Sequence, residues 1–352
     1  MVMKVGIALL GLGTVGATVL EILRENETYF ETELGVHICV YFVYVRDVHK
    51  KRTVSLDKIT VTDDVEMIMN SPQVDACIEC MGGSGTEVTF DIIMRLIEKR
   101  KHVIMSSKKC LALYKNEIIE KVNQYHVQLR YDATVGGSIP ICKVFQNLSG
   151  YDPIHRMYGI ANATTNYVLT LMQDKGMDYR TALEMAQKEG YAENNASDDV
   201  DGWDALYKMC ILLRFGAGID VETDQIIPKG LETIADIGFE TTTDIPSEKP
   251  EHKIKQIFYA EQLADDKIGY YVGPITVKTD TVLGNVEGQN NIIFVKNKYG
   301  GLRAYYGKGA GGKETAAIMV EDLLDAIFND IPLKAVKKCV YIEQMRRKEL
   351  RL

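Results

Sequence analysis

Three glycines near the N-terminus have the type and spacing needed to hold a phosphate group. They lie in Gly11-Leu-Gly-Thr-Val-Gly16, which follows an apolar run at residues 3–10 and opens a helix-spaced pattern. In such a turn the first glycine allows the tight bend, the second lets the backbone approach a pyrophosphate, and the third permits close helix–strand packing. The free N–H groups at the start of the helix then favour the phosphates. The alternative is a tight strand–helix turn that binds nothing. The context favours a dinucleotide site with these expected contacts: Gly11, Gly13, Thr14, Val15 and Gly16.

The residues after the next apolar run bear on which dinucleotide binds. An NAD site usually places Asp or Glu there to bond the ribose 2′-hydroxyl. This chain instead has Arg46-Asp47 followed by a basic cluster at 49–52. Arg46 could stack on the adenine and pair with a 2′-phosphate, which favours NADP(H) over NAD. The alternative is that the basic cluster is a solvated loop.

Asp204 and Lys208 form a second pair that could do chemistry. Their spacing of four residues places both side chains on one face of a helix. A lysine held by a carboxylate can exchange a proton with a substrate. The same spacing is also typical of a surface ion pair, and spacing alone favours that simpler interpretation.

Strands and helices alternate through the first part of the chain, and these elements must position the glycine turn. Apolar, β-branched runs typical of buried parallel strands alternate with amphipathic helical patterns. The expected strands are residues 3–10, 36–45, 58–62, 76–81, 102–106 and 127–131. The expected helices are residues 17–24, 90–99 and 116–125. The pattern predicts an α/β fold, namely a Rossmann-type doubly wound parallel sheet.

The regular alternation ends after residue 132, which predicts a second α+β domain; the family resemblance described below implies that this domain serves substrate binding and dimerisation. Helices are expected at residues 141–147, 179–189, 200–215 and 315–328. Antiparallel strands are expected at 268–278 and 291–298, with a hairpin turn at 298–301. We therefore expect a dinucleotide-binding domain at 1–140, a second domain at 141–305, and a C-terminal segment at 306–352 that returns to the first domain.

Composition excludes several classes of function. The chain has 352 residues and a formal net charge of -8, which argues against a nucleic-acid or membrane-surface binder. It has no run of about 18 apolar residues, so we expect no membrane span and a cytoplasmic location. The 7 cysteines are odd in number and scattered, which argues against a disulfide framework. Cys77 and Cys80 are expected to be two buried thiols rather than a metal site.

Six segments, in order along the chain, together resemble the homoserine dehydrogenase family. They are the glycine turn, Glu79–Gly83, Asp132–Pro140, Gly159–Tyr167, Gly190–Glu193 with Asp199–Lys208, and Gly309–Gly311 with Thr315. The resemblance implies reversible, NAD(P)-dependent reduction of L-aspartate 4-semialdehyde to L-homoserine, a step of threonine and methionine biosynthesis.

The resemblance also assigns roles to individual residues. Lys208 would donate and accept the proton, and Lys108 would assist through its charge or through solvent. Glu193 would receive the substrate ammonium, and Asp199 would order a water or orient Lys208. The remaining expected contacts are Asp204, Thr164 and Tyr191 with substrate, and Ser106 and Gly309 with the cofactor.

Two further properties follow from the resemblance. Family members often hold a monovalent cation such as sodium, for which the ligands here would be Asp132, Val135 and Gly137. Asp132 stands where glutamate is usual, and its shorter arm weakens this expectation. The resemblance also implies a homodimer, formed through strands of the second domain that include residues 268–298.

The chain departs from the family pattern at several positions near the expected site. Ser107 replaces an asparagine, Ala163 a glycine and Glu314 a proline, and both prolines are missing from the 194–196 loop. The chain also stops soon after its last helix, so we expect no regulatory amino-acid-binding domain. These departures leave two alternatives open: a dehydrogenase for another amino-acid semialdehyde or hydroxy amino acid, and a nucleotide-binding protein without activity.

Overall fold

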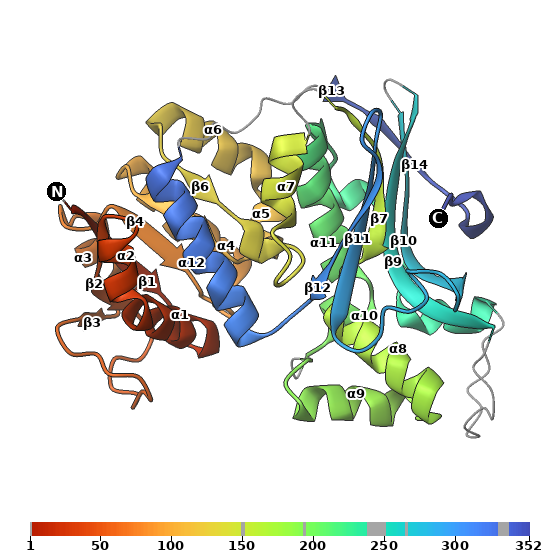
Figure 1. The fold of residues 1–352 in the computed structure, drawn as a ribbon, viewed down its shortest axis with the longest axis horizontal. Coiled ribbons are helices and arrows are strands. Elements are labelled where there is room, and N and C mark those ends of the chain that lie inside the picture. Colours follow the sequence, from red (N-terminus) through yellow and green to blue (C-terminus); the bar gives the residue numbers. More distant parts are fainter. Residues whose placement is uncertain (1, 149–151, 193–194, 238–250, 265–266, 330–337) are drawn as a thin grey trace. The chain divides into compact units, whose positions relative to one another are not determined.

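The computed structural model describes residues 2–148, 152–192, 195–237, 251–264, 267–329 and 338–352 (Figure 1). Contacts divide the chain into two compact units. The first comprises Met1–Thr134 and Gly312–Leu333, and the second comprises Val135–Gly311 and Lys334–Leu352. Each unit has its own sheet.

The first unit is built on a six-stranded parallel sheet with the order β3-β2-β1-β4-β5-β6. The strands are β1 (Met3–Leu10), β2 (Val36–Tyr44), β3 (Thr60–Thr62), β4 (Ala76–Glu79), β5 (His102–Met105) and β6 (Leu129–Arg130). The chain order reverses between β1 and β4, which is the point where open parallel sheets bind ligands. The predicted Rossmann-type sheet is therefore confirmed.

Helices α1 (Thr14–Glu25) and α12 (Gly312–Phe328) lie side by side in this unit (Figure 1). Their apolar side chains share a buried cluster with alternate side chains of β1, including Ile7 and Leu9. The other β1 side chains point to the opposite face of the sheet, because side chains alternate along a strand. The unit's remaining helices are α2 (Glu27–Thr32), α3 (Val65–Met69), α4 (Thr86–Glu98), α5 (Lys108–Leu113) and α6 (Lys115–Tyr125).

The second unit contains a mixed sheet with the order β12-β11-β7-β9-β10-β14. Its strands are β7 (Ile154–Ile160), β9 (His252–Ala264), β10 (Lys267–Lys278), β11 (Asn290–Asn297), β12 (Gly301–Lys308) and β14 (Tyr341–Gln344). All pairs are antiparallel except β10 with β14. The two predicted strands do not pair with each other: β10 pairs with β9, and β11 pairs with β7 and β12. A separate short sheet joins β8 (Ile219–Asp220) to β13 (Lys338–Cys339).

The helices of this unit are α7 (Ile141–Leu148), α8 (Ala163–Lys175), α9 (Tyr179–Lys188), α10 (Ser197–Val200) and α11 (Trp203–Ile211). The helix expected at 200–215 is present but begins at Trp203 rather than at residue 200. Gly202 adopts a left-handed conformation, with φ of 88°, and separates α10 from α11. A π-helical stretch then follows at Leu212–Ala217.

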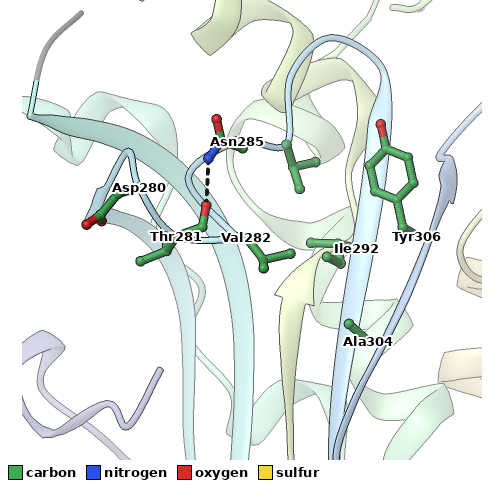
Figure 2. A pocket seen from close by; sticks show the side chains of 8 residues that line it. Asp280, Thr281, Val282, Asn285, Ile292, Ala304 and Tyr306 are labelled. Atoms are coloured by element: carbon green, nitrogen blue, oxygen red, sulfur yellow. Dashed lines mark hydrogen bonds between the residues drawn. The ribbon is translucent and has the colours of Figure 1, made fainter.

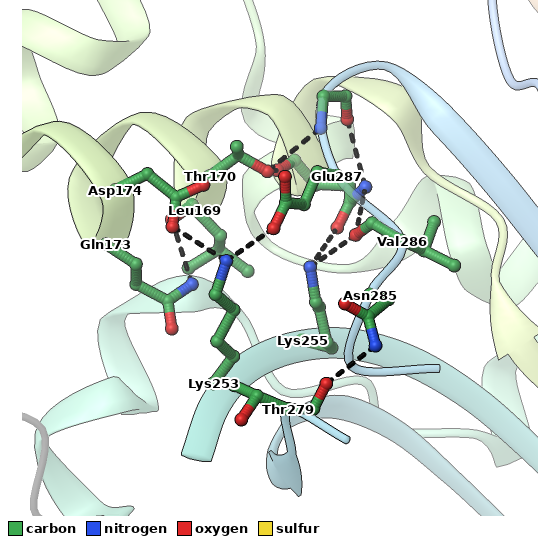
Figure 3. Close-up of polar contacts among 12 residues, drawn as sticks. Leu169, Thr170, Gln173, Asp174, Lys253, Lys255, Thr279, Asn285, Val286 and Glu287 are labelled. Carbon is green, nitrogen blue, oxygen red and sulfur yellow. Dashed lines mark hydrogen bonds and ion pairs between the residues drawn. The ribbon is translucent and has the colours of Figure 1, made fainter. Parts of the chain in front are cut away.

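A polar cluster around two buried lysines fixes α8 to the connection between β10 and β11 (Figure 3). Lys253 on β9 contacts Asp174 at 2.7 Å and Glu287 at 2.6 Å. The neighbouring Lys255 donates to Asn166 Oδ1 and to the Val286 carbonyl. Burial, followed by the positive charge of Lys253, lowers the pKa of Lys255 to about 8. These contacts hold α8 in place, and the N-terminus of α8 carries the polar groups of the site described next.

Candidate active site

The glycine turn has the geometry expected of a dinucleotide site. Gly11 has φ of 101°, and a Cβ there would lie 2.4 Å from the Cys80 carbonyl oxygen. A Cβ on Gly16 would lie 2.3 Å from the Gly11 carbonyl oxygen, so both positions require glycine. At Gly13 a Cβ would meet nothing within 4 Å. This open space beside the backbone is where a pyrophosphate would approach, and it supports the interpretation of the motif as a dinucleotide-binding turn.

Helix α1 begins directly at this turn. Gly13 is its N-cap, and the exposed Thr14 and half-buried Val15 form its first residues. The first N–H groups of a helix have no acceptor within the helix, so they can bind an anion. The geometry therefore fits the phosphates of a nicotinamide dinucleotide.

The loop after β2 places cations near this turn. Arg46 is exposed just beyond the strand. The Asp47 carboxylate accepts the backbone N–H groups of His49 and Lys50, at 2.9 and 3.2 Å, and so closes its own turn. Arg52 donates to the Leu12 carbonyl at 3.2 Å, which holds its guanidinium beside the glycines.

Ser106 and Lys108 follow β5 in the first unit. Both side chains are half-buried, and the Ser106 hydroxyl donates to the Glu79 carbonyl at 2.8 Å. Lys108 is the first residue of α5. Lys208 belongs to the second unit, so the two lysines expected at the reacting oxygen come from different units.

Lys208 is buried on α11 in the second unit. Its Nζ lies 2.7 Å from Asp204 Oδ2 and donates to the Ala161 carbonyl at 2.5 Å. Lys208 is 6% exposed and Asp204 is 1% exposed. This burial excludes the surface ion pair that the spacing alone favoured.

Asn162 connects the carboxylates of the site. Its Nδ2 donates to Asp199 Oδ1 and to Asp204 Oδ2, both at 2.7 Å. Its Oδ1 accepts the Thr165 N–H at 2.7 Å and so caps α8. The sequence prediction missed this role, although asparagine is a preferred N-cap residue and could have suggested the start of a helix here.

Thr164 and Tyr191, the two residues expected to line the substrate pocket, contact each other. The Thr164 hydroxyl donates to the Tyr191 carbonyl at 2.6 Å. The Tyr191 ring packs on Tyr167 with their centroids 4.9 Å apart, and the Tyr167 hydroxyl donates to Glu189. Glu193, expected to receive the substrate ammonium, lies outside the described residues.

The residues expected to hold a cation lie in the segment where the chain passes from the first unit to the second. Asp132 is buried in the first unit, where its backbone N–H donates to Asp322 Oδ2 at 2.9 Å. Burial, followed by the negative charge of Asp132, raises the pKa of Asp322. Val135 and Gly137 begin the second unit, and Gly137 has φ of 63°. A carboxylate and two backbone carbonyls are hard oxygen ligands, a donor set that suits a hard cation.

Gly309 lies close to this segment within the second unit. A Cβ on Gly137 would lie 2.4 Å from the Lys308 carbonyl oxygen, and a Cβ on Gly309 would lie 2.2 Å from the Asn291 amide oxygen. Both glycines are therefore required by close backbone packing. This packing is a structural explanation that holds whether or not Gly309 also contacts a cofactor.

A separate surface pocket lies in the second unit (Figure 2). Its volume is about 470 Å³, and it shares no lining residue with the lysine–carboxylate site. The lining residues are Asp280, Thr281, Val282, Asn285, Val286, Ile292, Ala304 and Tyr306.

Within the described ranges, no helix is long and apolar enough to cross a membrane.

The fold and site together define a class of protein. The first unit has a doubly wound sheet with a dinucleotide turn, and the second, α+β unit buries a lysine–carboxylate pair. This combination is the architecture of a nicotinamide-dependent oxidoreductase. Sequence models narrow the class further. The model described as "Homoserine dehydrogenase, NAD binding domain" matches residues 11–132, and the model described as "Homoserine dehydrogenase" matches residues 140–324. The chain belongs to the homoserine dehydrogenase family, as its motifs predicted.

Individual relatives agree with this assignment. A homoserine dehydrogenase of Bacillus subtilis is 32% identical over 92% of this chain and 73% of its own length. One from Synechocystis is 34% identical over 92% of this chain and 74% of its own length. The crystal structure of a homoserine dehydrogenase from Thiobacillus denitrificans matches with a TM-score of 0.83 and 31% identity, over 92% of this chain and 73% of that one. The function of the chain is that of its family, the NAD(P)-dependent interconversion of L-homoserine and L-aspartate 4-semialdehyde.

Proposed function

We propose that Lys208 exchanges the substrate hydroxyl proton during the oxidation of L-homoserine. The supporting observation is the burial of Lys208 with its Nζ 2.7 Å from the Asp204 carboxylate. A basic side chain held in a fixed position inside the protein can take up a proton without first having to be oriented.

In the oxidation, the neutral Lys208 amine accepts the proton from the hydroxyl oxygen as the hydride leaves the carbon that carries this oxygen. In the reduction, the Lys208 ammonium returns the proton to the oxygen. Bound nicotinamide supplies the hydride acceptor or donor. Lys108 contributes positive charge near the oxygen, which stabilises a developing alkoxide.

The carboxylates of the second unit hold the amino-acid part of the substrate. Asp199 and Asp204 are linked through Asn162, so a displacement of one affects the other. Asp199 orients Lys208 through this linkage. Glu193 receives the substrate ammonium, and Thr164 and Tyr191 line the pocket.

A direct assay of NADP reduction measures the activity and the role of Lys208, and it would also detect a different specificity or an inactive nucleotide-binding protein. We expect homoserine-dependent reduction of NADP. Turnover of another hydroxy amino acid without turnover of homoserine would contradict the proposed substrate. Lys208→Ala should lower kcat by about 100-fold or more, whereas Lys101→Met should not, because that buried lysine donates to the Ser71 and Val74 carbonyls outside the site. If Lys208→Ala retained most of the activity, the proton-transfer role would be wrong.

NADP(H) is the proposed cofactor in preference to NAD. Arg46 and Arg52 support it, because they bring two guanidinium groups to the loop after β2, and arginine pairs well with phosphate. Arg46→Ala should lower kcat/KM for NADP by about tenfold, while changing kcat/KM for NAD little. An equal loss with both cofactors would rule out a 2′-phosphate contact.

Asp132, Val135 and Gly137 are proposed to hold a monovalent cation such as sodium. Thermal unfolding in sodium chloride and in choline chloride, at equal ionic strength, tests this site. A sodium-specific rise in Tm that disappears in Asp132→Asn supports the site. An identical Tm in both salts rules it out.

A homodimer is the proposed assembly, formed through strands of the second unit that include residues 268–298. Exposed apolar side chains nearby support it: Val282 is 63% exposed, and Leu302 and Tyr306 on β12 are 52% and 60% exposed. Sedimentation equilibrium should give a dimer mass for the native chain. Tyr306→Glu should shift the mass toward the monomer, and a native chain that sediments as a monomer would contradict the proposal.

A further inference from the structure

Glu79 is a fully buried carboxylate at the end of β4, and none of the site assignments above uses its side chain. It is 0% exposed. One carboxylate oxygen accepts the Met81 N–H at 2.7 Å. The other accepts the N–H groups of Ser106 and Ser107, at 3.1 and 2.9 Å. Three backbone donors therefore converge on one side chain.

This arrangement connects two loops at the ligand-binding edge of the parallel sheet. Met81 belongs to the loop after β4, and Ser106 and Ser107 belong to the loop after β5. The Ser106 hydroxyl donates back to the Glu79 carbonyl, which completes a ring of contacts. Burying a carboxylate costs several kcal/mol unless hydrogen bonds compensate. All three bonds to the carboxylate come from loop backbone, so their geometric effect is to fix the positions of these two loops.

The second loop leads directly into Lys108. Ser107 is the N-cap residue of α5, and its own side chain makes no capping hydrogen bond. The Ser107 N–H is instead held by Glu79. Lys108 is the next residue, so its backbone direction depends on a peptide group that Glu79 fixes.

We infer that Glu79 is a positioning residue for Lys108: its carboxylate sets the loop from which the Lys108 ammonium reaches the reacting oxygen. The inference rests on the proposed role of Lys108. Glu79 would act through Lys108 and not on the substrate itself. Such positioning matters because a displacement of about 1 Å in a catalytic group can lower the rate by about 100-fold.

A double-mutant cycle tests the inference. Glu79→Gln preserves size but places an NH₂ group against at least one backbone N–H. We expect it to lower kcat by about 10- to 100-fold, through displacement of Lys108. In the Lys108→Ala background the same substitution should cause little further loss. A purely structural role would not produce this coupling, because a general loosening of the fold would lower kcat in both backgrounds.

Two further variants keep the test decisive if Glu79→Gln folds poorly. Ser107→Pro removes one of the three donors and leaves the carboxylate intact, and the Ser107 φ of -74° is compatible with proline. It should show the same dependence on Lys108. Asp75→Asn is the matched control, because Asp75 accepts the Gly6 N–H at the opposite end of β4, and it should leave kcat unchanged.

The outcomes distinguish a failure of the inference about Glu79 from a failure of the proposed role of Lys108. If Lys108→Ala leaves kcat unchanged, the role of Lys108 is wrong and the inference falls with it. If Lys108→Ala lowers kcat but Glu79→Gln lowers kcat by the same factor with and without Lys108, the role of Lys108 stands and the positioning by Glu79 is wrong. An unchanged kcat in the folded Glu79→Gln variant overturns the inference in the same way.

Discussion

Replacing Asn162 by aspartate is the most direct perturbation of the lysine–carboxylate site. The substitution keeps size and keeps an oxygen that can accept the Thr165 N–H, so α8 retains its N-cap. It removes the two N–H donors that lie 2.7 Å from Asp199 and Asp204. A third carboxylate oxygen then faces two others in a buried site, where like charges repel strongly.

The magnitude follows from the two lost bonds. A hydrogen bond to a charged group contributes about 1.5–3 kcal/mol. The contribution of the bond to Asp204 lies at the upper end of this range, because both partners are buried. The contribution of the bond to the half-buried Asp199 lies at the lower end. We therefore expect the free energy of unfolding to fall by about 4.5 kcal/mol. Movement of Asp204 would carry Lys208 with it, so kcat should fall by about 100-fold.

Urea denaturation and the homoserine-dependent reduction of NADP measure the two effects. The matched control is Asp178→Ala, which removes the N-cap of α9 outside the site. It should cost about 1 kcal/mol and leave kcat unchanged. A variant Asn162→Asp with native stability and native kcat would show that Asn162 does not organise the two carboxylates.

Three other perturbations have definite expected outcomes. Lys255→Met tests the buried lysine whose pKa is lowered to about 8 by burial and by Lys253. Between about pH 8 and about pH 10.5 the unfolded chain binds the Lys255 proton and the folded chain does not. The free energy of unfolding of the native protein, relative to that of the variant, should therefore rise by up to about 3 kcal/mol across this range. A difference that stays constant with pH in urea titrations would contradict this expectation. Gly13→Val should weaken NADPH binding, measured by fluorescence titration, while leaving the urea midpoint nearly unchanged, because the space is open; unaltered affinity would argue against a phosphate there. Asp325→Asn should lower stability by about 3 kcal/mol, because it leaves the buried Arg130 guanidinium without its charged partner at 2.6 Å; a native unfolding midpoint would count against this pair.

The first unit could be predicted well from the sequence, because its signals are local. Buried parallel strands are nearly continuous apolar runs, and the glycine turn has a fixed spacing. The start of α1 illustrates the limit: the apolar period began at residue 17, but the helix begins at Thr14, where N–H groups rather than apolar packing matter.

The second unit was harder to predict, because its pairing depends on distant segments. Strand β9 was missed, since it carries Lys253, Lys255 and Gln256 among its apolar residues and so lacks a clear apolar pattern. Those charged side chains are satisfied by α8 and by the connection at 285–287, which lie far away in sequence. Asn162 was missed for the same reason: its contacts with Asp199 and Asp204 span 37 and 42 residues.

The departures from the family pattern have local explanations in the fold. Ala163 is buried as the first residue of α8, a position where alanine favours the helix more than the usual glycine does. Glu314 lies in the first turn of α12, where a negative charge is favourable and where proline is also tolerated. Ser107 is held through its backbone N–H, so the loss of an asparagine side chain there leaves the Glu79 contact in place. Each replacement suits the element that carries it, and none removes a polar contact among Asn162, Asp204 and Lys208. The departures therefore favour retained chemistry over a catalytically retired protein.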